Sequence, residues 1–307
     1  MTDTRPDQPV LGLALGGGAA KGWAHIGVLQ ELERMNLRPR VVCGTSIGAL
    51  VGAVYASGQL EAFSDWVQSL TVRDVLGLMD FSFSGGVIKG EKLFEFFQER
   101  HQNPDIQDLD IDFAAVATDM RNGRETWVDR GPVLQAARAS CALPGLFSPV
   151  QHEGHWMLDG GLVNPVPVSV CRARGADVVL AVNLNHLPAG RPIARPSRRR
   201  MAEEKPGDPD ESFWQKVMSF LGSEEDEDPG FFDVMTASVN IMQDRITRSR
   251  MAGDPAEEVL APELGDFAIM DFHRAGEAIE EGRRLTREAE QRLRAWVGDD
   301  KPAGDDG

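Results

Sequence analysis

Residues 41–56 read VVCGTSIGALVGAVYA, and this stretch decides the fold. The apolar run 41–43 suits a buried strand, and the alanine, leucine and valine residues after Gly48 have helical spacing. Ser46 lies between these two elements, with Gly44 and Gly48 two residues before and after it, which is the pattern of a nucleophile elbow. In so tight a turn, side chains at both glycines would collide with the backbone, and the serine hydroxyl is exposed at the helix N-terminus. The pattern predicts a strand, a turn with a nucleophilic serine and a helix; the alternative is a glycine-rich turn on a core helix.

The same region has a second interpretation that we reject. Residues 41–60 carry no charged side chain, over a length close to that of a membrane span. Repeated glycines and the strand–turn–helix pattern interrupt the run, so we assign it to an α/β domain instead.

A second glycine-rich turn follows the first predicted strand. Apolar residues 10–15 lead into GGGAAKG at 16–22, and apolar residues at helical spacing follow. Strand, glycine loop and helix together form an anion-binding layout. Neither a P-loop nor a dinucleotide fingerprint fits, because Lys21 precedes a glycine and occupies the sixth position of the motif. Since parallel neighbouring strands carry their loops at one edge, we expect this loop to meet Ser46 and to bind the oxyanion of an acyl transfer.

Length, charge and cysteine content narrow the class of protein. The chain has 307 residues, enough for one large core or two modest ones, and a net charge of −16. This charge argues against a nucleic-acid-binding protein and against simple electrostatic attraction to anionic membranes. Three scattered cysteines without a CxxC spacing, and a polar N-terminal stretch without an apolar signal region, predict a cytoplasmic protein with reduced thiols.

A serine nucleophile needs a base, and the sequence offers two kinds. Among six histidines, His273 stands late in the chain, as in hydrolases with the order Ser, Asp, His. However, Ser46 follows only about one βα unit, and His273 begins a predicted helix, so we expect a structural or surface histidine there. Asp159 precedes two glycines after the apolar residues 156–158, and partial burial would raise its pKa enough to accept a proton. From the residues alone, an ordinary Asp-Gly turn is the simpler interpretation.

The order of three motifs along the chain favours a catalytic Asp159 over an ordinary turn. GGGAAKG at 16–22, GTSIG at 44–48 and DGG at 159–161 resemble the patatin-like phospholipase family, and the C-terminal part resembles its bacterial RssA-type group. The resemblance implies an α/β, three-layer fold with a mainly parallel central sheet. It implies a lipid acyl hydrolase with Ser46 as nucleophile and Asp159 as base, without a histidine. It also implies an oxyanion hole at Gly16, Gly17 and Gly18, no metal, no cofactor, and a lipid or small ester as substrate. A Ser-His-Asp esterase and a catalytically idle regulatory protein with this fold are the alternatives.

We expect a single domain over residues 10–296, with a mobile insertion at 186–230 and a polar tail at 299–307. Within the insertion, residues 213–221 have one apolar face at helical spacing, close to the arginines at 198–200. Such a face is compatible with transient membrane contact, and equally with packing on the core or on a second subunit of a homo-oligomer.

Overall fold

The computed structural model describes residues 9–78, 81–82, 87–88, 94, 102–144, 147–186 and 231–298. The predicted insertion after residue 186, its apolar face at 213–221 and the polar tail at 299–307 lie outside these residues. They therefore stay predictions, as does the single domain over 10–296.

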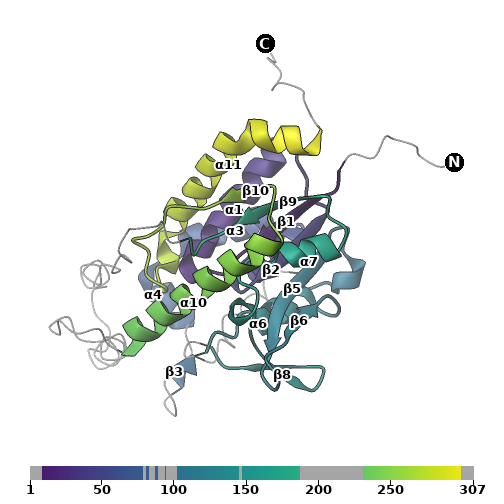
Figure 1. The fold of residues 1–307 in the computed structure, drawn as a ribbon. Helices are drawn as coiled ribbons and strands as arrows, with labels where there is room; N and C mark the ends of the chain where they lie inside the picture. Colours follow the sequence, from purple (N-terminus) through teal and green to yellow (C-terminus); the bar gives the residue numbers. More distant parts are fainter. Residues whose placement is uncertain are drawn as a thin grey trace.

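A mainly parallel sheet forms the centre of the fold (Figure 1). Its strands are β1 (Leu11–Leu15), β2 (Val41–Thr45), β5 (Asp112–Asp119), β6 (Glu125–Val128), β7 (Val150–His152), β8 (His155–Asp159), β9 (Val178–Val182) and β10 (Glu258–Leu260). The order of this eight-stranded sheet is β10-β9-β1-β2-β5-β8-β7, with β6 also paired to β5. The neighbours from β10 to β5 pair in parallel. In contrast, β6 and β8 are antiparallel to β5, and β7 is antiparallel to β8. The strands β3 (Phe81–Ser82) and β4 (Val87–Ile88) form a separate pair.

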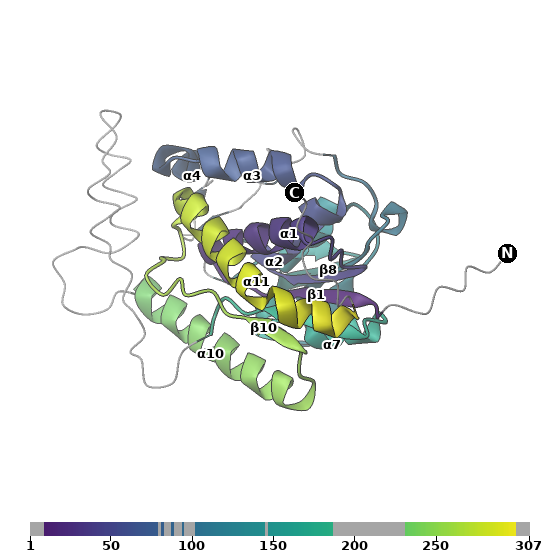
Figure 2. The ribbon, with the colours of Figure 1, turned by 90° about the horizontal axis from the view of Figure 1, so that it is seen from above.

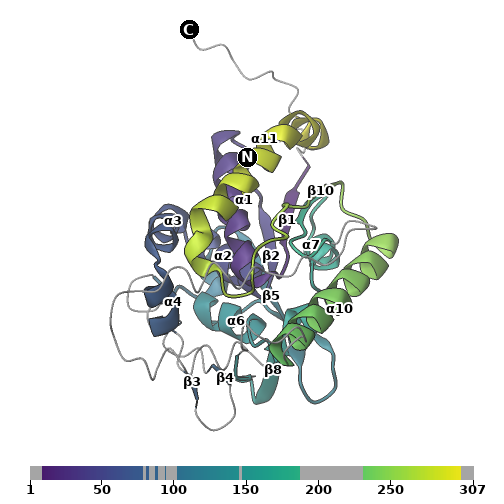
Figure 3. The same cartoon turned by 90° about the vertical axis from the view of Figure 1, so that its left-hand side faces the viewer.

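Helices cover both faces of this sheet and make three layers, as Figure 3 shows. The described helices are α1 (Ala24–Arg34), α2 (Ile47–Ala56), α3 (Leu60–Ser69), α4 (Val72–Leu78), α6 (Val133–Ser140), α7 (Val168–Ala173), α10 (Phe231–Gly253) and α11 (Ala275–Val297). Helices α1, α2, α6 and α11 lie on one side, whereas α7 and α10 lie on the other (Figures 2 and 3). The fold is therefore the three-layer α/β arrangement that the sequence predicted.

The alternation of side chains along the strands fills both interfaces between layers. Leu13 and Phe113 belong to the larger core beneath α1 and α2. Ala14 and Ala114, one strand position away in each case, belong to the smaller core beneath α7. Full burial of a side chain such as Leu13 contributes about 1.5–3 kcal/mol.

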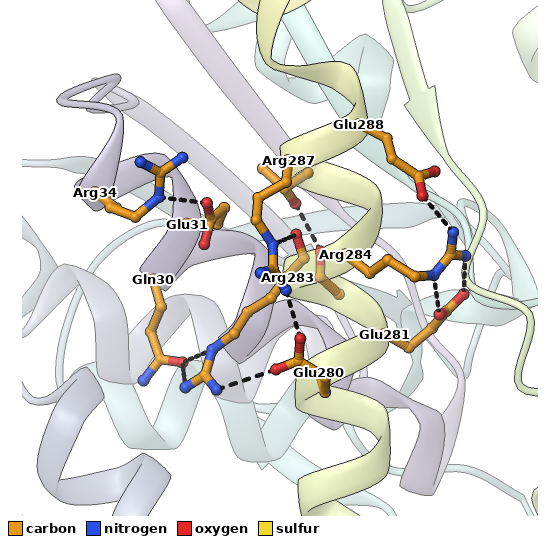
Figure 4. Close-up of polar contacts among 11 residues, drawn as sticks. Gln30, Glu31, Arg34, Glu280, Glu281, Arg283, Arg284, Arg287 and Glu288 are labelled. Atoms are coloured by element: carbon orange, nitrogen blue, oxygen red, sulfur yellow. Dashed lines mark hydrogen bonds and ion pairs between the residues drawn. The ribbon is translucent and has the colours of Figure 1, made fainter. Parts of the chain in front are cut away.

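Helix α11 is held along α1 by close backbone packing and by polar contacts. A Cβ atom on Gly27 would lie 1.9 Å from the carbonyl oxygen of Ile279, so the two helices touch there. Arg283 of α11 donates two hydrogen bonds, of 3.2 and 2.7 Å, to the side-chain oxygen of Gln30 on α1 (Figure 4). Most of the other ion pairs in Figure 4 are on the surface, and exposed pairs contribute only about 0–1 kcal/mol. The close packing therefore matters more than the charges.

Short 3-10 turns interrupt the regular elements, and one of them differs from the sequence interpretation. The glycine loop does not lead directly into a regular helix, because a 3-10 turn, η1 (Ala19–Trp23), precedes α1. Three further 3-10 turns are η2 (Ile106–Asp108), η3 (Gly160–Leu162) and η4 (Phe272–Arg274). In the part of the chain that the structure describes, no helix is both long and apolar enough to span a bilayer.

Candidate active site

Ser46 stands on the sharp turn between β2 and α2. Its backbone has φ 56° and ψ −126°, a conformation that non-glycine residues seldom adopt. A Cβ atom on Gly44 would lie 2.4 Å from the Cα of Ala49, and one on Gly48 would lie 2.2 Å from the carbonyl oxygen of Leu15. Both contacts are with backbone atoms, so a side chain at either position would displace the turn. The steric reason for the two glycines is therefore the one predicted from the sequence.

The hydroxyl of Ser46 donates a hydrogen bond of 2.6 Å to Oδ2 of Asp159. Asp159 ends β8, which pairs with the carboxyl end of β5 and so brings the acid to the edge of the sheet where β2 also ends. The second carboxylate oxygen, Oδ1, accepts the N–H of Gly161 at 2.7 Å. The carbonyl of Asp159 accepts the hydroxyl of Thr118 at 2.8 Å. Both carboxylate oxygens and the backbone are thus fixed.

Burial changes the acidity of this carboxyl. Asp159 is 0 % exposed, and its removal from water raises its pKa to about 6, although the hydrogen bonds from Ser46 and Gly161 act in the opposite direction. At pH 7 most molecules therefore carry an ionised Asp159 that can still accept a proton. A carboxylate with this pKa is a more effective base than an exposed aspartate.

The segment 140–142 connects the two members of this pair, and the sequence interpretation assigned it no role in the site. Ser140 is fully buried, and its hydroxyl oxygen accepts the N–H of Ser46 at 2.8 Å. The same hydroxyl donates to the carbonyl of Val116 at 2.5 Å. Two residues later, the carbonyl of Ala142 accepts the N–H of Asp159 at 2.9 Å. The signal in the sequence is the small-residue block that begins at Ala139 and Ser140, between the elbow and the DGG motif.

Cys141 lies within this segment and next to the pair. Burial and the negative charge of Asp159 raise the pKa of its thiol well above the usual value. The thiol therefore stays protonated at neutral pH and is a poor nucleophile beside Ser46.

The glycine loop meets the serine as the parallel arrangement of β1 and β2 requires. A Cβ atom on Gly17 would lie 3.5 Å from the Cβ of Ser46. The N–H of Gly16 donates to Val182 and that of Gly17 to Pro165, each at 3.0 Å. The N–H of Gly18 donates no hydrogen bond to any of the described residues. The loop is thus anchored by two of its amides, and the third is available.

The side chains of His25 and Lys21 stabilise the glycine loop through hydrogen bonds to backbone carbonyls. The ring nitrogen Nε2 of His25 lies 2.8 Å from the carbonyl of Gly16, and because a carbonyl can only accept, Nε2 is the donor. Burial lowers the pKa of His25 to about 4, so this ring is neutral. Nζ of Lys21 lies 3.4 Å from the carbonyl of Leu184, and burial lowers the pKa of this ammonium group as well. Lys21 thus ties the loop to the segment after β9.

A bridge of two amide side chains links the glycine loop to the turn after Asp159. The Nδ2 group of Asn185 donates to the carbonyl of Gly17 at 3.1 Å and to Oε1 of Gln243 at 2.5 Å. Gln243 belongs to α10, and a Cβ atom on Gly161 would lie 2.3 Å from its Nε2. Both amides are buried. Nothing in the sequence pointed to Asn185 or Gln243, because they are far apart in the chain and belong to no motif.

None of the described histidines contacts the Ser46–Asp159 pair. Of those that the structure describes, His25, His152, His155, His186 and His273, none hydrogen-bonds to Ser46 or Asp159. His273 lies in the turn η4 at the start of α11. No group of three or more His, Cys, Asp or Glu side chains that could hold a metal ion occurs among the described residues.

Comparisons with known proteins identify the family of this chain. A family model for patatin-like phospholipases matches residues 13–172. An uncharacterised NTE family protein of Mycobacterium tuberculosis is 32 % identical, over 95 % of this chain and 93 % of its own length. The lysophospholipase NTE1 of Coccidioides immitis is 28 % identical over 92 % of this chain, which corresponds to 18 % of that longer protein. Among solved structures, VipD of Legionella pneumophila is similar with a TM-score of 0.40 and 16 % identity, over 64 % of this chain and 52 % of that one.

Proposed function

Because the chain belongs to the patatin-like phospholipase family, we propose that it hydrolyses acyl ester bonds of lipids with a Ser46–Asp159 dyad. The observation that supports this proposal most strongly is the 2.6 Å hydrogen bond from the Ser46 hydroxyl to Oδ2 of Asp159. A nucleophile and a base at this distance meet the geometric requirement for proton transfer.

In the first half of the proposed reaction, Oγ of Ser46 attacks the ester carbonyl and its proton passes to Oδ2 of Asp159. The tetrahedral intermediate carries a negative oxygen, which the N–H of Gly18 stabilises while Gly16 and Gly17 keep the loop in place. One such donor is worth about 3–4 kcal/mol of transition-state stabilisation. When the intermediate collapses, the bond to the alcohol breaks, and the leaving oxygen takes the proton from Asp159.

In the second half, Asp159 accepts a proton from water as the water oxygen attacks the acyl carbonyl on Ser46. The second tetrahedral intermediate uses the same Gly18 amide. Its collapse releases the fatty acid, and Oγ of Ser46 recovers the proton from Asp159. The cycle uses only groups of this chain and one water molecule.

The location that we propose is the cytoplasm. Cys43, Cys141 and Cys171 are all free and buried. Free thiols are typical of proteins in reducing compartments.

Turnover of a water-soluble nitrophenyl ester tests the chemistry. Ser46→Ala should abolish turnover, and Asp159→Asn should lower it about 10²- to 10⁴-fold, the range for loss of a positioned base. His273→Ala and Ser69→Ala, an exposed serine on α3, are the controls and should keep most of the activity. Loss of activity in His273→Ala with retention in Asp159→Asn would instead support a histidine-dependent esterase. A wild-type protein that hydrolyses no ester would support the catalytically idle alternative.

A further inference from the structure

Exposed apolar side chains gather at the edge of the sheet where the Ser46–Asp159 pair lies. Met120 follows the last residue of β5, and its N–H donates to the carbonyl of Trp156 at 2.8 Å. Their side chains are 57 % and 51 % exposed. Since β5 runs parallel to β2, its carboxyl end is at the same edge as Ser46. Trp156 is in β8, three residues before Asp159 on the same strand.

Helix α10 presents a second apolar surface to solvent near this edge. Ile241 and Met242 are 42 % and 49 % exposed, whereas the next residue, Gln243, is buried against Gly161. Thr247, one turn further, is buried as well. At this point the helix turns Gln243 and Thr247 inward and exposes two apolar side chains, whereas a surface helix ordinarily buries its apolar residues. Exposed apolar side chains that lie next to one another are typical of a surface that binds a partner.

The strand register places Trp156 on the face of the sheet that α10 covers. Glu125 of β6 is opposite Thr118 of β5, and Thr118 is opposite Leu158 of β8. By alternation, Trp156 points to the same face as Leu158 and therefore as Glu125. The carboxylate of Glu125 accepts a hydrogen bond of 2.6 Å from Arg250, so this is the face that α10 covers. Figure 3 shows α10 along this face.

Three arginines that form no ion pair with the described carboxylates accompany these apolar residues, in contrast to the net charge of −16 for the whole chain. Arg121 and Arg124 lie on the exposed turn between β5 and β6, directly after Met120. Arg245 lies on the exposed side of α10, one turn from Ile241. Among the described residues, no carboxylate forms an ion pair with any of these three guanidinium groups. All three side chains are exposed and can reach anionic groups outside the protein.

We propose that Met120, Trp156, Ile241 and Met242, which we call the apolar rim, dock the protein on the surface of a phospholipid bilayer. The inference rests on the proposed function, since a lipid hydrolase must bring its dyad to the lipid. Tryptophan favours the boundary between headgroups and acyl chains, and small apolar surfaces insert there reversibly. Arg121, Arg124 and Arg245 would bind lipid phosphates, a local attraction that the overall negative charge does not provide. Because Met120 and Trp156 lie at the carboxyl end of β5, docking through the rim brings this end of the sheet, where Ser46 also lies, close to the lipid.

Co-sedimentation with vesicles tests the rim. The vesicles contain phosphatidylcholine with phosphatidylglycerol, and the full chain is used. The test variant carries Met120→Ser, Trp156→Ser, Ile241→Ser and Met242→Ser. The control variant carries Val259→Ser and Trp296→Ser, two residues that are also 41 % and 45 % exposed but belong to β10 and the far end of α11. Hydrolysis of the soluble nitrophenyl ester is measured in parallel, because it does not require docking.

The rim variant should lose at least about tenfold in vesicle binding and in hydrolysis of the vesicle lipid, and keep its turnover of the soluble ester. The control variant should match the wild type in all three measurements. Unchanged vesicle binding in the rim variant would overturn the proposal, as would an equal loss in the control variant. A rim variant that changes from dimer to monomer in sedimentation, with vesicle binding intact, would show a subunit interface instead. If the wild type binds vesicles through the rim but hydrolyses neither substrate, the docking surface stands and the proposed function fails.

Discussion

The hydroxyl oxygen of Ser140 lies 2.8 Å from the backbone nitrogen of Ser46 and accepts its N–H. The bond fixes the nucleophile at the one residue of the turn whose φ, 56°, is unfavourable for a residue with a side chain. The Ser140 hydroxyl is itself oriented by donating to Val116 on β5. The strained turn is therefore attached to the neighbouring strand through a buried side chain.

Replacement of Ser140 by alanine should leave the buried N–H of Ser46 without an acceptor. The cost of one such unsatisfied group is about 1–3 kcal/mol, so both the free energy of unfolding and the turnover number should fall. We expect kcat for the soluble ester to decrease about 10- to 100-fold, with a small change in KM. Ser69→Ala, on the surface, is the matched control. A Ser140→Ala protein with wild-type kcat would show that the turn holds its geometry without this bond.

The Asn185–Gln243 bridge makes a second prediction about geometry. Gln243→Ala removes the acceptor of the Asn185 amide and the group that packs on Gly161, so both the glycine loop and the acid turn lose support. The expected result is a decrease in kcat of about tenfold or more, the size of one lost buried hydrogen bond. Ser249→Ala, on the exposed side of the same helix, should have no effect. If both variants lower kcat equally, the helix contributes only general stability.

The pKa of Asp159 predicts how activity depends on pH. Asp159 must be ionised to accept the proton of Ser46, and burial raises its pKa to about 6. The value of kcat/KM should therefore increase with pH up to about 6 and level off above it. His25, with a pKa near 4, cannot produce this limb. If the increase of kcat/KM with pH disappears in His273→Ala, the titrating group is a histidine and the proposed dyad is contradicted.

The same pKa predicts a stability change for Asp159→Asn. The pKa in the folded state, about 6, lies above the usual 3.8, so the folded protein binds this proton more tightly than the unfolded chain does. The stabilising contribution is complete below about pH 4 and is lost as the pH rises through 6. At pH 8 the buried charge costs on the order of 3 kcal/mol, and asparagine removes it.

Denaturant unfolding of Asp159→Asn should therefore show a gain in stability over the wild type at pH 8 and little or no gain at pH 4. Asp65→Asn, at an exposed position on α3, serves as the control and should change stability little at either pH. A destabilised Asp159→Asn at pH 8 would mean that the hydrogen bonds of the carboxylate outweigh its burial.

The sequence determined the parts of the site that depend on local sterics and on strand order. The positions of Gly44 and Gly48 have no room for a side chain, and the spacing of these glycines around Ser46 predicted this constraint. The meeting of the glycine loop with Ser46 follows from two neighbouring parallel strands. The partnership with Asp159 was less accessible, because an Asp-Gly turn is common, and only the order of three motifs suggested it.

The remaining contacts depend on tertiary packing that no local pattern encodes. Gln243 is on an amphipathic helix, where a polar residue normally faces solvent, yet it is buried over the acid turn. Trp156 begins the apolar run 156–158, and its exposure results from the position of β8 near the edge of the sheet. The 3-10 turn at η1 also has no signal in the residues, because alanine and glycine are compatible with several turn geometries.

Active-site labelling tests the central claim, that Ser46 is a nucleophile activated by Asp159. The protein is treated with a fluorophosphonate, and the modified residue is identified by mass spectrometry in the wild type, in Asp159→Asn and in His273→Ala. We predict a single adduct on Ser46, formed at the wild-type rate in His273→Ala and at least about 100-fold more slowly in Asp159→Asn. An adduct on another residue, or an undiminished rate in Asp159→Asn, would contradict the account.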